Sequence, residues 1–165
     1  MEIGPVTLEG KRVRLESMRA FLAASIAGLA RGAVLPFTTI DRASGRIVGS
    51  TSYLAIEPAH KRLEIGATWI TPSCQRGPVN TEAKLLQLTH CFEVLGCNRV
   101  EFKTDERNAK SRAALARIGA KEEGTFRAHM LMLDGHVRSS VWFSVIASEW
   151  PGVKPGLVRK LARSS

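Results

Sequence analysis

Apolar and polar positions alternate with a period of two in several stretches of the chain, which is typical of half-buried strands. These stretches are Lys11–Glu16, Leu35–Ile40, Arg46–Ile56, Arg62–Ile70 and Arg99–Thr104. The turn formers Asp41–Gly45 separate the second and third of them. We therefore expect a sheet in which the second, third and fourth strands form an antiparallel meander. Gly66, inside the fourth strand, predicts a bulge or a close approach of the backbone.

Three other stretches repeat their apolar residues at helical spacing and end at a glycine, which is favoured just after a helix. They are Met18–Arg31, Val79–Leu95 and Asn108–Ile118. Near the end of the chain, Asp134-Gly135 separates Gly124–Leu133 from Val137–Ala147 and predicts a β-hairpin. A short basic helix is expected at about residues 155–163. The class is α+β, with a mixed, mostly antiparallel twisted sheet of about seven strands flanked by helices.

Length and composition favour one domain over residues 1–165. Apolar residues make up 44% of the chain, yet no apolar run is long enough to cross a bilayer. The opening Met1–Pro5 lacks the basic start and apolar run of a secretory signal. We expect a cytoplasmic protein that does not act at a membrane.

The cysteines Cys74, Cys91 and Cys97 are odd in number and form no C-x-x-C pair. This pattern argues against a disulfide framework and against a zinc site. We expect free thiols in or near the core, and no bound metal.

The formal net charge of +9 implies an anionic partner. Nucleic acid, an acidic membrane and a polyphosphate cofactor all fit that charge. The basic residues form no block interleaved with aromatic side chains, and the chain has one tyrosine. A nucleic-acid partner is therefore not favoured.

The most informative stretch is Gln75–Leu86, where a strand leads through a basic, glycine-containing loop into a helix that begins just after Pro78. The first N–H groups of a helix have no partner within the helix, and they carry a partial positive charge. Such a helix start binds phosphate groups.

The element order, together with Leu63–Gly66, Asn80–Lys84 and Asn108-x-x-Ser111, resembles the GNAT superfamily of acetyl-CoA-dependent N-acetyltransferases. Within that superfamily, the chain is similar to the RimJ/RimL-type branch, which includes enzymes that acetylate the N-terminal amines of ribosomal proteins. The similarity runs from about Leu8 to Trp150. It implies the GNAT fold and transfer of an acetyl group to a primary amine by direct attack in a ternary complex. The acceptor, a protein N-terminus or a small-molecule amine, is left open.

The resemblance also implies a set of cofactor-binding residues. The loop pattern of the superfamily begins here at Gln75, and Pro78 takes the place of a glycine, which removes one N–H donor. The remaining donors for the pyrophosphate of coenzyme A are the amides of Arg76, Gly77, Val79 and Asn80. The alternative is an ordinary strand-to-helix turn with a solvated arginine.

By the same resemblance, Thr68, Trp69 and Ile70 splay from the next strand and offer backbone groups to the pantetheine arm and the thioester. The alternative is an intact sheet with Trp69 in the core. Asn108 would both cap its helix and bind the cofactor arm, although capping alone explains an Asn there. Ser111 would bind near the cofactor sulfur and protonate the leaving thiolate, while Leu115 occupies the place where many members have a tyrosine.

An amine must lose a proton before or during its attack. Some relatives place a glutamate where this chain has Met130, so Glu64 and His129 are the remaining candidates for the catalytic base. Neighbouring residues of a strand point to opposite faces, and His129 can therefore replace that glutamate only with a shift in register. Proton loss to water, without a dedicated base, is the third possibility.

Relatives usually have two helices between the first and second strands, whereas Met18–Ala33 has room for one. The shortened N-terminal helical region predicts an open acceptor pocket, which a second copy of the chain can complete as a homodimer. Two alternatives to an enzyme follow. One is a non-catalytic acyl-CoA-binding protein, and the other is a ribosome- or RNA-associated module suggested by the charge.

Overall fold

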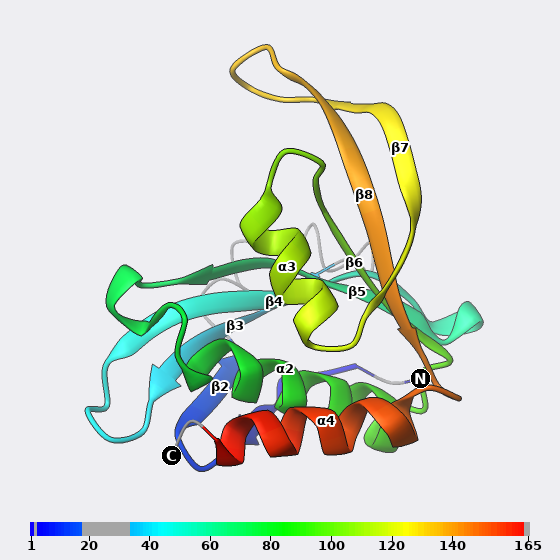
Figure 1. The fold of residues 1–165 in the computed structure, drawn as a ribbon. Helices are drawn as coiled ribbons and strands as arrows, with labels where there is room; N and C mark the ends of the chain where they lie inside the picture. The colour runs from blue at the N-terminus through cyan, green and yellow to red at the C-terminus, as the bar shows by residue number, and fades with distance from the viewer. Residues whose placement is uncertain (2, 18–33, 164–165) are drawn as a thin grey trace.

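A computed structural model describes residues 1, 3–17 and 34–163 (Figure 1). The helix predicted over Met18–Arg31 lies outside the described residues. The strands are β1 (Thr7–Glu9), β2 (Val13–Ser17), β3 (Val34–Asp41), β4 (Ile47–Glu57), β5 (Arg62–Ile70), β6 (Arg99–Asp105), β7 (Lys121–Leu131) and β8 (Val137–Ile146). The helices are α2 (Pro78–Thr89), α3 (Ala109–Arg117) and α4 (Trp150–Ala162).

The eight described strands form one sheet in the order β1-β2-β3-β4-β5-β6-β8-β7. All neighbours are antiparallel except β5 and β6, which are parallel and are joined through α2. The mixed, mostly antiparallel α+β architecture is therefore confirmed. The strand beyond the expected seven is β1, whose three residues include one apolar side chain and are too few to show a period.

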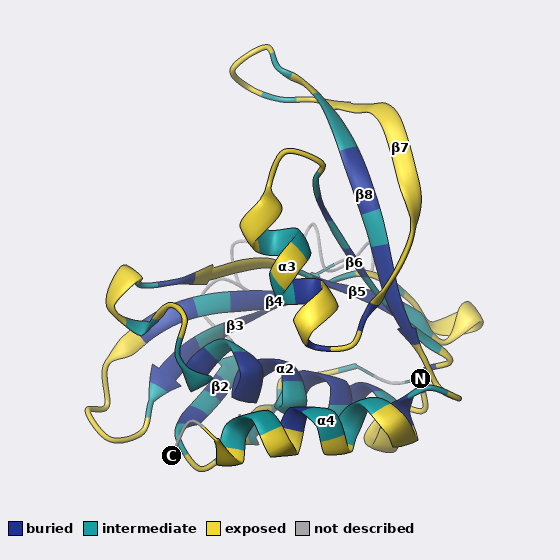
Figure 2. Cartoon of the chain, viewed as in Figure 1, coloured by how far each residue is buried: buried dark blue, intermediate teal, exposed yellow. Residues whose placement is uncertain are grey.

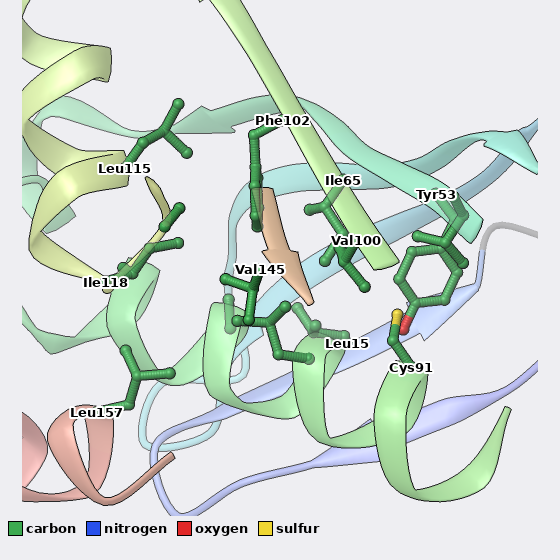
Figure 3. Packing of buried hydrophobic residues seen from close by; sticks show 14 of the residues in the cluster. Leu15, Tyr53, Ile65, Cys91, Val100, Phe102, Leu115, Ile118, Val145 and Leu157 are labelled. Atoms are coloured by element: carbon green, nitrogen blue, oxygen red, sulfur yellow. The ribbon is translucent and has the colours of Figure 1, made fainter. Parts of the chain in front are cut away.

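The three described helices lie on one face of the sheet, where α4 packs mainly against α2 (Figure 1). The core between sheet and helices is formed by apolar side chains from both (Figure 3). The strands contribute Leu15, Ile65, Val100 and Val145, and the helical side contributes Cys91 just beyond α2, Leu115 of α3, Ile118 just after α3, and Leu157 of α4. Along β6 buried residues alternate with half-buried ones, because Val100, Phe102 and Thr104 face the helices. The odd-numbered residues of β6 face the opposite side of the sheet.

The predicted helix over Val79–Leu95 is α2 followed by a π-helical turn at His90–Val94. Gly96, with φ +64°, follows the helical segment as predicted. The C-terminal helix begins at Trp150, earlier than the expected residue 155. Pro151 stands in its first turn, where a missing N–H costs no helical hydrogen bond. Pro155, inside the helix, loses only a bond to the carbonyl of Pro151.

The predicted hairpin is present as β7 and β8, although β7 begins at Lys121 rather than Gly124. At its turn the N–H of His136 donates to Asp134 Oδ1 over 3.0 Å, and Gly135 has φ +80°. The hairpin extends away from the helices, and β7 is exposed along its whole length (Figure 2).

Candidate active site

The parallel pairing of β5 with β6 stops after Glu64 and Glu101, although both strands continue. Beyond this point Ala67, Thr68 and Trp69 are exposed, and the edge of β5 that faced β6 has no described strand partner. The side chain of Trp69 is 56% exposed, so it is not part of the core. The strands separate where the sequence led us to expect backbone donors.

A bulge interrupts the pairing of β5 with β4 at the same place. Ser52 pairs with Gly66 and Ser50 pairs with Trp69, so Thr51 faces two residues, Ala67 and Thr68. Ala67 has a left-handed φ of +47°. A Cβ at Gly66 would lie 2.8 Å from Leu54 Cδ1 and 2.9 Å from Glu64 Oε1, so the predicted close approach at this glycine is present.

The loop after β5 leads directly to the start of α2. The side chain of Gln75 donates from Nε2 to the carbonyl of Ile70 over 2.9 Å, which holds the loop against the end of the strand. Arg76 has φ +60°, Gly77 is the N-cap residue and Pro78 is the first helical residue.

No side chain caps the start of α2 among the described residues. The amides of Val79 and Asn80 lie in the first turn, where the helix offers them no acceptor. Asn80 Oδ1 is also buried without a described partner. The loop and the first turn together provide the uncapped helix start that an anion requires.

Asn108 caps α3 as predicted, because its Oδ1 accepts the N–H of Ser111 over 3.0 Å. Ser111 is half-buried in the first turn of that helix. Leu115, one turn further, packs in the core. At the other end of α3, Arg117 Nη1 donates to Thr81 Oγ1 of α2 over 2.8 Å, so the two helices are fixed relative to each other.

Glu64 and His129, the two candidates for the base, lie on the sheet face opposite the helices. Glu64 is 4% exposed, and its Oε2 lies 2.9 Å from Lys103 Nζ. That ammonium lies 5.6 Å from the ring of Trp142, and the ring of His129 packs edge-on against Trp142 at 4.8 Å. Lys103 and Trp142, which connect the two candidates, were not singled out from the sequence.

His129 reaches this face because β7 contains a bulge between Phe126 and Met130. Ala128, in the bulge, has φ +49°, and His129 Nδ1 lies 3.1 Å from Ser140 Oγ. The bulge leaves Phe126 and Met130 on the same face, because they pair with Ser140 and Arg138, and His129 turns toward Trp142 within the irregular segment. No glycine marks the bulged residues, so the position of the bulge had no signal in the sequence.

A surface hollow of about 360 Å³ lies on the same face and is bordered by the aromatic side chains of Phe126 and Trp142. Its charged border consists of Arg62, Arg99, Glu101 and Glu123. Arg99 Nη1 donates to Glu123 Oε1 over 2.7 Å, so part of that charge is already paired. The hollow thus lies on the sheet face that also carries Glu64 and His129.

The three cysteines are free thiols, two of them buried and Cys74 half-buried, as the sequence predicted. Burial raises the pKa of the Cys91 thiol well above its usual value. Within the described ranges, no group of three His, Cys, Asp or Glu side chains is arranged to hold a metal ion. No helix in the described part of the chain is long and apolar enough to cross a membrane.

Lys84 is the second group that the sequence analysis missed. It is buried on α2, and its Nζ contacts Thr51, Thr68 and Gln87. Burial lowers the pKa of this lysine to about 7. A signal was present, because Lys84 and Gln87 fall at helical spacing with the core residues Leu88 and Cys91.

Residues 4–121 match a family described as "Acetyltransferase (GNAT) domain". A curated relative from Bacillus subtilis, "Putative ribosomal N-acetyltransferase YdaF", is 34% identical over 110 residues, which cover 67% of this chain. The chain spans 59% of the length of that relative.

Solved structures share the fold over nearly the whole chain. A GCN5-related N-acetyltransferase from Brucella melitensis superposes with a TM-score of 0.86 at 31% identity, covering 96% of this chain and 86% of that one. A structure described as a "putative acetyltransferase" from T. thermophilus gives 0.85 at 34% identity, covering 98% of this chain and 100% of that one.

Proposed function

The chain belongs to the GNAT acetyltransferase family, and from this membership we propose that it transfers an acetyl group from acetyl-CoA to a primary amine. The observation that carries the proposal is the separation of β5 from β6 beside the uncapped start of α2. These two features supply backbone donors for a thioester and for a pyrophosphate.

Acetyl-CoA supplies an activated carbonyl carbon, which the amine nitrogen attacks directly in a ternary complex. The residues of the chain hold and orient the reactants. The amides of Arg76, Gly77, Val79 and Asn80 bind the pyrophosphate, and Asn108 binds the cofactor arm. Backbone groups of Thr68, Trp69 and Ile70 hold the arm and stabilise charge on the thioester oxygen, where preorganised donors contribute most.

Proton transfers complete the reaction. As the new C–N bond forms and the C–S bond breaks, the nitrogen loses a proton and the departing sulfur gains one. Ser111 donates the proton to sulfur from the first turn of α3. His129 takes the proton from nitrogen, since Glu64 is buried and already paired with Lys103. Within the described residues Nδ1 of His129 contacts Ser140, which leaves Nε2 for the acceptor.

The acceptor we propose first is a protein N-terminus. The name of the Bacillus subtilis relative describes a ribosomal acetyltransferase, which supports a protein acceptor. The hollow also carries the rings of Phe126 and Trp142, and aromatic faces attract the ammonium group at the end of a peptide.

The test combines calorimetry with an assay of released thiol. Acetyl-CoA should bind in the absence of acceptor, and thiol release should require an amine. The acceptor panel contains peptides with free N-termini, the same peptides with blocked N-termini, polyamines, amino acids and aminoglycosides. Binding without turnover on any amine would favour a non-catalytic acyl-CoA-binding protein. Salt-sensitive binding of RNA without binding of acetyl-CoA would favour the RNA-associated alternative.

A further inference from the structure

Lys84 occupies an unusual place for a lysine. It is 4% exposed on α2, and its Nζ lies 2.9 Å from Thr51 Oγ1, 2.9 Å from Thr68 Oγ1 and 3.0 Å from Gln87 Oε1. Within the described residues no carboxylate pairs with it. Burying an amine without an opposite charge costs free energy, and an apolar side chain of the same length would avoid that cost. The contacts that Lys84 makes are therefore the feature to explain.

These contacts join the two sides of the β5 bulge. Thr51 belongs to β4 and Thr68 to β5, and their hydroxyl oxygens lie 2.9 Å apart. Ala67, next to Thr68, has a left-handed backbone that an L-residue keeps only where its surroundings hold it. Lys84 contacts the bulge from the helix side through Thr68 Oγ1, although Thr68 as a residue is exposed.

The number of hydrogen bonds that the Lys84 side chain can make equals the number of oxygens around it. An ammonium has three N–H groups, and three oxygens surround this one. A neutral amine donates two hydrogens and accepts one from a threonine hydroxyl, so the same three contacts persist. Gln87 is fixed in turn, because the hydroxyl of Thr51 donates to its Oε1 over 3.2 Å. Cys91 interacts electrostatically with Lys84, and the hydroxyl of Tyr53 donates to the carbonyl of Gln87 over 3.1 Å. Burial raises the pKa of both Cys91 and Tyr53 well above their usual values.

We propose that Lys84 is a positioning residue for acetyl transfer, which holds Thr68 against Thr51 and thereby fixes the bulged backbone that faces the thioester. This inference rests on the proposed function, because it assigns that backbone to the cofactor. A lysine with a merely structural role would change stability when replaced and leave the bulge and the turnover rate unchanged.

The experiment uses Lys84→Met, which keeps length and apolar bulk, and Thr68→Val, which removes one hydroxyl at an exposed position. The control is Leu88→Ala, which creates a cavity in the core one turn further along the same helix. Amide hydrogen exchange on the free proteins measures the order of residues 67–70. Steady-state kinetics with saturating acetyl-CoA measure kcat and the KM for the amine.

We expect the amides of residues 67–70 to exchange faster in Lys84→Met and Thr68→Val than in wild type. In the control Leu88→Ala, any increase in exchange should not be confined to these residues. In both test variants kcat should fall roughly tenfold to a hundredfold, because misplaced donors lose that much rate, with little change in the KM for the amine. The double variant should lose no more than Lys84→Met alone. If both test variants keep wild-type exchange and kcat, the inference is overturned, and Thr68→Val decides if Lys84→Met does not fold. An inactive wild type with altered exchange in the variants would instead overturn the proposed function.

Discussion

Replacing Gly77 with aspartate should weaken binding of acetyl-CoA by roughly a hundredfold or more without unfolding the protein. Gly77 is the N-cap residue of α2 and has φ −102°, which any residue adopts. A Cβ there meets only the carbonyl oxygen of Cys74, at 3.6 Å. Aspartate is a favoured N-cap and differs from glycine by a few tenths of a kcal/mol, so we expect the free energy of unfolding to change by less than about 0.5 kcal/mol.

The expected loss of affinity has two sources. The new carboxylate accepts hydrogen bonds from the first-turn amides of α2, which are the donors proposed for the pyrophosphate. It also repels that group. One added charge about 5 Å from one phosphate charge, at an effective dielectric constant of about 20, costs about 3 kcal/mol. This cost corresponds to a loss of roughly a hundredfold in affinity.

Calorimetric titration of acetyl-CoA into wild type, Gly77→Asp and Gly77→Asn separates these two sources. Asparagine has nearly the same size and also caps helices, but carries no charge. We expect a small loss for Gly77→Asn and a much larger one for Gly77→Asp, which added salt partly relieves. Binding by Gly77→Asp as tight as that of wild type, in a protein with an unchanged melting temperature, would show that this loop does not hold the cofactor.

Three further predictions concern other parts of the molecule. Between pH 7 and 9 the free energy of unfolding of wild type should rise by on the order of 2 kcal/mol relative to Lys84→Met. The reason is that the lysine keeps its proton in the unfolded chain but releases it in the folded protein, where its pKa is lowered to about 7. Urea unfolding at both pH values measures the difference between the two proteins, and the same difference at pH 7 and pH 9 would refute the prediction. Glu82→Gln should lower the free energy of unfolding by about 2–3 kcal/mol, because the Glu82 carboxylate accepts hydrogen bonds from the N–H groups of residues 11–13. Thermal melts measure this loss, and the control Glu9→Gln, at an exposed position, should leave the melting temperature nearly unchanged. His129→Gln should lower kcat with little change in the affinity for acetyl-CoA, and an unchanged kcat would shift the role to Glu64 or to water.

The sequence predicted those parts of the fold in which pattern and burial agree. The alternation in Arg62–Ile70 gives the bounds of β5, and Gly66 indicated the irregularity that lies beside it. The start of a helix beside Pro78, within one residue of its predicted position, and the cap at Asn108 follow from local chemistry alone. Each of these features depends on a few neighbouring residues, which is why one sequence suffices to predict them.

The missed features depend on residues far apart in the chain. A lysine on a helix is ordinarily solvated, and only the contact of Lys84 with Thr51 and Thr68 shows that this one is enclosed. Likewise, Trp142 connects His129 to Lys103 only because the bulge in β7 turns the histidine toward it. Pairing register and bulges set these contacts, and neither leaves a regular spacing in the sequence.

The same separation of strands explains why the proposed site uses both faces of the sheet. The uncapped start of α2 and the cluster around Lys84 lie on the helix side, whereas Glu64, Lys103 and Trp142 lie on the other. An intact β5–β6 pair would isolate these two sides from each other with a ladder of hydrogen bonds. Because the pairing ends after Glu64 and Glu101, a thioester held from the helix side can meet an amine that arrives from the opposite face. In the proposed reaction this opening is where the two reactants would meet, and the β5 bulge that Lys84 contacts lies on its border.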